Sequence, residues 1–139
     1  GVVGLFGWAF LGDRKGQRIL LAAIGLFLAG ICVGLTAYTS TAGGALALLI
    51  SGVFFQSAYN AQEFATLQDM VASHRVGAAS GLYNGLTVLV GGVSGSFIPG
   101  GIVALTGDFQ TGILSIACGA WLVSLCLITL WQLKKKIPA

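Results

Sequence analysis

Four side chains able to form hydrogen bonds recur within one long apolar stretch. Gln56, Tyr59, Asn60 and Glu63 follow each other at offsets of three, one and three residues. On a helix these offsets give one face about 100° wide. Polar groups are costly in hydrocarbon, so this face should point into a helix bundle or a water-filled cavity. Two interpretations stay open: the face lines a solute cavity, or it joins helices by hydrogen bonds. Glu63 is a separate case, because a carboxylate at the membrane interface costs little.

A second polar side is predicted on the next apolar stretch. Its members are Ser80, Tyr83, Asn84, Thr87, Gly91 and Ser94. Tyr83, Asn84 and Thr87 join Gln56, Tyr59 and Asn60 as candidates for lining a cavity. Three glycines, Gly81, Gly85 and Gly92, form a small-residue side next to it. Such glycines let helices approach closely. With Pro99 they also leave the helix able to bend, so packing and a gating hinge are both open interpretations.

The composition indicates which elements carry these residues. Hydrophobic residues make up 56% of the chain and charged residues 8%, whereas soluble domains carry roughly a quarter charged residues. This places the chain in the membrane class. Backbone groups find no partners in hydrocarbon, so spans are helices or closed barrels, and the apolar runs here are too long and too uniform for barrel strands. The predicted fold class is therefore all-α integral membrane.

Apolar runs and turn signals divide the chain into four complete spans after one partial helix. The predicted spans are residues 19–38, 45–64, 77–105 and 111–133, preceded by the end of a truncated helix at 1–12. Loops are expected at 13–18 and 67–76, and a tail at 134–139. Helical spans need about 20 residues, which each of the four supplies.

This division places all the basic residues on one side of the membrane. The seven are Arg14, Lys15, Arg18, Arg75, Lys134, Lys135 and Lys136, and the opposite side carries only Asp108. By the positive-inside rule the basic side, with the C-terminus, is cytoplasmic. Short basic blocks between long uncharged runs argue against a nucleic-acid partner. The bilayer itself is the expected partner.

The four spans differ in polarity. The first and last carry few polar residues, whereas the second and third carry the two polar faces. A simple four-helix anchor would not need two polar interior faces, but a transport path would. No group of His, Asp, Glu and Ser within the spans suggests an enzyme, and neither Cys/His spacing nor His74 indicates a metal. No cofactor is expected.

The loop at 13–18 contains the most specific motif. Asp13 can pair with Arg14 or Arg18, or cap the following helix, and Gly16 permits an unusual backbone angle. Residues 9–18, AFLGDRKGQR, resemble the signature cytoplasmic loop of the major facilitator superfamily, G-x-L-A-D-R-x-G-R-R. They depart from it at Ala9, Gly12 and Gln17. Residues 77–85, GAASGLYNG, look like the start of that family's helix 11.

The resemblance covers nearly the whole chain. It implies a C-terminal fragment, from the end of helix 8 to helix 12, within the C-terminal six-helix half of a twelve-helix bundle. In that family helices 10 and 11 line the central cavity, in agreement with the polarity of the second and third spans. The implied localisation is multi-pass in the plasma or inner cell membrane, and the implied partner is the missing N-terminal part of the same protein.

The implied activity is secondary transport of a small organic solute by alternating access, coupled to a proton or sodium. Among subfamilies the nearest likeness is to organic-anion symporters and organophosphate antiporters. Asp13, Arg14, Gly16 and Arg18 would form the cytoplasmic gating loop. The alternative is a self-contained four-helix membrane protein, acting as a small exporter subunit or an assembly scaffold.

Overall fold

The computed structural model describes residues 1–136, so residues 137–139 of the predicted tail lie outside the described part. Six α-helices follow in order: α1 (Val2–Lys15), α2 (Arg18–Thr36), α3 (Ala42–Met70), α4 (Val76–Leu86), α5 (Val93–Thr106) and α6 (Phe109–Lys136). A 3₁₀ turn, η1 (Ser73–Arg75), precedes α4, and a π-helical segment, η2 (Thr87–Gly92), joins α4 to α5. Residues 1–136 contain no β-strand.

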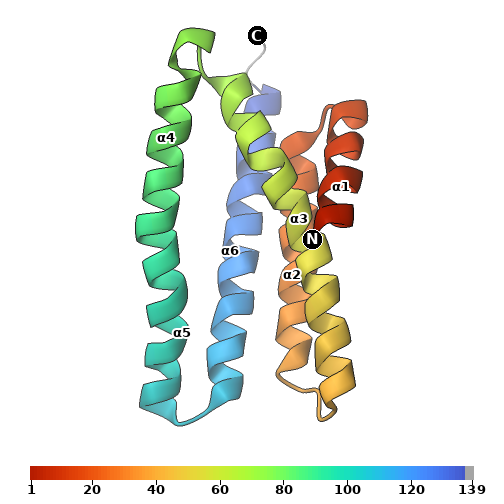
Figure 1. Ribbon diagram of the computed structural model, residues 1–139, viewed down its shortest axis with the longest axis vertical. Coiled ribbons are helices and arrows are strands. Elements are labelled where there is room, and N and C mark those ends of the chain that lie inside the picture. Colours follow the sequence, from red (N-terminus) through yellow and green to blue (C-terminus); the bar gives the residue numbers. More distant parts are fainter. Residues whose placement is uncertain (137–139) are drawn as a thin grey trace.

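Four helical segments are long and apolar enough to cross a membrane: Arg18–Thr36, Ala42–Met70, Ser73–Thr106 and Phe109–Lys136. They overlap the four predicted spans, and the prediction that the chain is all-α is confirmed for residues 1–136. In Figure 1 the four run up and down alternately, with the α2–α3 and α5–α6 connections at the bottom and the α3–α4 connection at the top.

The helices extend further than the predicted spans at the charged end. Helix α1 continues to Lys15, α3 to Met70 and α6 to Lys136, so much of the predicted loop at 67–76 is helical. Hydropathy locates the edge of the hydrocarbon. A helix forms its own backbone hydrogen bonds, so it can continue past that edge into the headgroup region. The helices therefore extend beyond the predicted spans at this end.

Helices α1, α2, α3 and α6 pack into one group, here called the packed block. Its contacts rest on small residues, since Ala23, Ala58 and Ala117 are fully buried. Gly25 of α2 lies against Ala58 and the Phe55 carbonyl of α3. Close approach through small residues is how membrane helices gain dispersion contacts without a hydrophobic driving force.

Helices α4 and α5 with η2 form one continuous rod, here called the α4–α5 rod. It stands beside the packed block (Figure 1), and none of its residues is buried by the described part of the chain. At the lower end the rod meets α6, where Gly112 lies against Val103 and the Pro99 carbonyl. At the upper end it meets α3.

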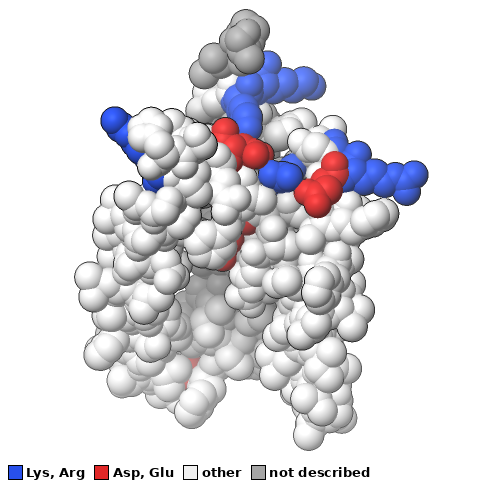
Figure 2. Space-filling view, turned by 45° about the horizontal axis from the view of Figure 1, so that its top comes forward, with Lys and Arg blue, Asp and Glu red and all other residues white. Residues whose placement is uncertain are grey.

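The basic residues gather at one end of the molecule. They lie at the end of α1, the start of α2, the η1 turn and the end of α6, and Figure 2 shows the blue side chains together there. Below this end the space-filling surface is hollowed, and the rest of the visible face is almost free of charge (Figure 2).

Candidate functional site

One polar cluster joins the rod to the packed block. The Tyr59 and Tyr83 hydroxyls lie 2.9 Å apart, and the Tyr83 hydroxyl donates to Glu63 Oε2 at 3.0 Å. The Tyr83 ring also packs edge-on against Phe64, with ring centroids 5.7 Å apart. Tyr59 and Glu63 are one turn apart on α3, so both reach the same point on α4. The three side chains adjoin a pocket of about 220 Å³ between α2, α3, α4 and α6.

The other two predicted residues of α3 lie around the helix from this cluster. Gln56 and Asn60 are exposed and line a second pocket, of about 370 Å³, beside the start of α1. The 100° face is therefore split, with Tyr59 toward α4 and Gln56 and Asn60 toward α1. The structure does not bring these amides into contact with the tyrosine pair.

On the rod, Asn84 and Thr87 are exposed and line neither of these pockets. Thr87 opens the η2 segment, which sequence reasoning missed. A π-helical turn widens the spacing of the backbone hydrogen bonds, and such turns are frequent at functional sites. No composition rule singles out Thr87–Gly92 as π-helical, because the run is as apolar and glycine-rich as its flanks.

The glycine side of the rod has no partner among the described residues. A Cβ atom built at Gly81, Gly85 or Gly92 meets no atom within 4 Å. Pro99, in contrast, lies where the rod turns against α6, and its carbonyl is close to Gly112. Packing of the glycine side against another helix stays a prediction.

A different set of polar groups joins the helices of the packed block. Gln62 is 1% exposed and donates from Nε2 to the Trp8 carbonyl of α1 at 2.7 Å. Ser124, also 1% exposed, donates to the Ala23 carbonyl at 2.8 Å. Sequence reasoning missed both. A usable signal was the glycine pair Gly4 and Gly12, because both face α3 and Gly12 leaves room for the Gln62 amide.

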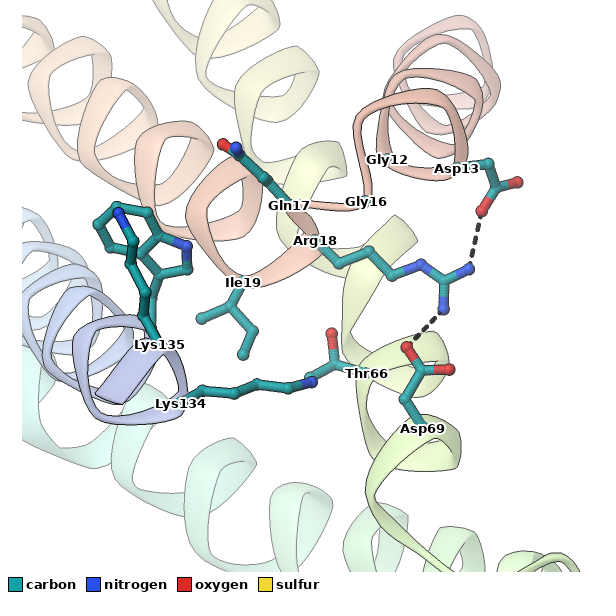
Figure 3. Close-up of a pocket in the computed structure, with 11 residues that line it drawn as sticks. Gly12, Asp13, Gly16, Gln17, Arg18, Ile19, Thr66, Asp69, Lys134 and Lys135 are labelled. Atoms are coloured by element: carbon teal, nitrogen blue, oxygen red, sulfur yellow. Dashed lines mark hydrogen bonds and ion pairs between the residues drawn. The ribbon is translucent and has the colours of Figure 1, made fainter. Parts of the chain in front are cut away.

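The charged loop forms an ion-pair network at the basic end (Figure 3). Arg18 donates from Nη2 to Asp13 Oδ1 and from Nη1 to Asp69 Oδ2, both at 2.9 Å. Gly16 ends α1 with φ 63°, a left-handed angle that glycine adopts at no steric cost. Of the options open from sequence, Asp13 pairs with Arg18, and no side chain caps α2. Arg14 takes part in neither ion pair.

Asp69 is the member of this network that sequence reasoning missed. It was assigned to a loop, but α3 continues through it and carries it to Arg18, 51 residues away in the chain. An acidic residue on the basic side, at the end of a neighbouring span, is the signal that could have identified it.

At the opposite end Asp108 caps α6. Its carboxylate accepts hydrogen bonds from the Gln110 and Thr111 backbone amides at 3.0 and 3.3 Å. The Gln110 amide is the main cause of a pKa for Asp108 below its ordinary value, because these bonds favour the charged form. Thr111 Oγ1 also lies 3.1 Å from Thr106 Oγ1, so this turn ties the rod to α6.

Within residues 1–136 no three His, Cys, Asp or Glu side chains gather in a way that could hold a metal ion. No family model, curated protein or solved structure matches the chain. The resemblance of residues 9–18 and 77–85 to a transporter family therefore stays a prediction.

Proposed function

We propose that this chain is part of a secondary transporter of the major facilitator type, which moves a small organic solute by alternating access. The observation that carries the proposal is the exposure of Gln56, Asn60, Asn84 and Thr87 on helices of membrane-spanning length. Lipid tails offer these amides and hydroxyls no hydrogen-bond partner, so the groups require a water-filled cavity or further protein around them.

The unburied rod supports the same proposal. In α2, 44% of the residues in its most apolar stretch are buried within the structure, whereas none of the residues in the corresponding stretch of the rod is buried. A glycine-rich face that meets no neighbour fits a helix that packs against further helices of a larger bundle. A self-contained four-helix protein would leave this face to lipid.

The contacts suggest how such a transporter would move. The Arg18 bridges to Asp13 and Asp69 join the loop before α2 to the end of α3, as a latch on the cytoplasmic side. The Tyr59–Tyr83–Glu63 cluster is the polar contact between the α3 and α4 surfaces. Rocking of the rod against the packed block would break this cluster while η2 and Pro99 absorb the bending.

An uptake assay on the full-length protein in proteoliposomes tests the proposal. Organic anions are screened first, with and without an imposed proton or sodium gradient. On the transported solute, Asn60→Ala and Asn84→Ala should each reduce kcat/KM about ten-fold, the effect of losing one hydrogen bond of about 1.4 kcal/mol. Thr129→Ala is the matched control, because within residues 1–136 the Thr129 side chain bonds only to the Leu125 carbonyl of its own helix.

Wild-type transport in both asparagine variants would contradict the cavity assignment. Absence of uptake for every solute class, with the protein folded, would favour the self-contained membrane protein instead.

A further inference from the structure

A pocket of about 530 Å³ opens at the basic end, between the start of α2 and the ends of α3 and α6. Figure 3 shows it with Arg18 on one side and Lys134 and Lys135 on the other. Thr66 and Asp69 of α3 also line it, Gly12 and Asp13 come from the end of α1, and Gly16 and Gln17 come from the α1–α2 connection. In a bilayer that the four apolar segments cross, this charged end of the molecule would face the lipid headgroups.

The two lysines are the cations of this pocket that remain available to a ligand. Arg18 is already held by two carboxylates. Within residues 1–136, no carboxylate lies within ion-pair distance of Lys134 or Lys135. The Lys134 side chain extends across the pocket toward Thr66 (Figure 3), while the Lys135 ammonium lies 5.5 Å from the centre of the Trp131 ring.

The pocket also has an apolar wall, made by Ile19 and the half-buried Trp131. Tryptophan is enriched at membrane interfaces, where its ring sits at the level of the headgroups. A soluble anion would use only the lysines, whereas a phospholipid presents a phosphate with an apolar chain directly beside it. The juxtaposition of lysines, hydroxyl and apolar wall therefore favours a lipid over a soluble anion.

We propose that this pocket binds the phosphodiester of an anionic phospholipid from the surrounding bilayer. Lys134 and Lys135 hold the phosphate, Thr66 donates a hydrogen bond to it, and the start of an acyl chain lies along Ile19 and Trp131. Basic pockets between helix ends on the cytoplasmic side are suited to such headgroups. Lipid binding at this site requires membrane insertion but not transport. A failed transport assay would therefore not contradict lipid binding, and a failed lipid titration would not contradict the proposed function.

Native mass spectrometry of the full-length protein in neutral detergent tests this site. The protein is titrated with phosphatidylglycerol or with phosphatidylcholine of the same chain composition. Phosphatidylglycerol should bind preferentially, and Lys134→Gln with Lys135→Gln should reduce that preference about ten-fold or more, since each lysine near an anionic lipid contributes roughly five-fold. Trp131→Leu, which keeps both lysines, should also weaken binding.

Lys15→Gln with Arg75→Gln is the matched control. Both residues are exposed at the same end but do not line the pocket, and this pair should keep the preference to within about two-fold. Circular dichroism checks that each variant stays helical. Equal losses in the two pairs, or no loss in either, would overturn the proposal. Displacement of the lipid by inorganic phosphate would show a soluble phosphate ligand and overturn the lipid assignment.

Discussion

The packed block and the α4–α5 rod are made from the same kind of sequence but are held in different ways. Both are apolar, rich in glycine and marked by polar side chains at helical spacing. In the block, small residues such as Gly25 meet backbone, and Gln62 donates to the Trp8 carbonyl. In the rod, a Cβ atom added at Gly85 would meet no atom of the described residues, and Asn84 is exposed. A small-residue face therefore shows that a helix can pack closely, but it does not determine which helix packs against it.

The glycines provide the strongest test of this difference. Gly25→Ala would push a methyl group into the Ala58 side chain and the Phe55 carbonyl, and overpacking of this kind costs about 1–3 kcal/mol. In a protein made of residues 1–139 alone, Gly85→Ala should leave the free energy of unfolding unchanged or raise it by up to about 1 kcal/mol, because no described residue lies against Gly85 and alanine is the better helix former. Unfolding in detergent, followed by circular dichroism, measures both. If Gly85→Ala were as damaging as Gly25→Ala, the rod would be packed as tightly as the block.

Gln56 and Gln62, two of the three glutamines of α3, test the polar groups. Gln62→Leu keeps a side chain of similar size but removes the hydrogen bond to the Trp8 carbonyl, and a hydrogen bond between membrane helices contributes about 0.6–1.7 kcal/mol. Gln56→Leu, on the exposed face six residues earlier, should leave stability unchanged within about 0.5 kcal/mol. The same unfolding assay compares them. Equal losses would show that Gln56 also joins helices, which is the packing interpretation of the polar face.

The smallest effect is expected at Asp108, where the rod is tied to α6. A pKa below the ordinary value means that the charged carboxylate stabilises the fold at neutral pH, and that this contribution is lost as pH falls through the lowered pKa. Asp108→Asn should lower the melting temperature slightly at pH 7, and the difference from wild type should shrink below about pH 4. Thermal unfolding from pH 7 to pH 3 measures it. A difference that stays constant across this range would contradict the capping role.

Much of the architecture was predictable because the bilayer imposes it. Runs of uncharged residues and the turns between them predicted four spans, and four suitable helices are present. The helix ends were less predictable, as Met70 and Lys136 show. At the level of the headgroups a residue finds hydrogen-bond partners inside or outside a helix, so either conformation costs little free energy.

The candidate site was predictable only in part. Helical spacing identified Tyr59 and Tyr83 as members of polar faces, and the structure brings these two together. The same spacing grouped Gln56 with Tyr59, although the two line different pockets. A polar face 100° wide can meet two neighbours at once, and periodicity along one helix contains no information about where those neighbours stand.

The sequence by itself determined the membrane class, the four spans and the collection of the basic residues at one end, because each follows from the cost of placing polar groups in hydrocarbon. The tertiary structure decided which polar side chains pair, as with Gln62 and the Trp8 carbonyl or Arg18 and Asp69. Those pairings join residues about 50 positions apart. They depend on the crossing of α3 with α1 and α2, and this crossing is fixed by contacts between small residues that hydropathy does not distinguish.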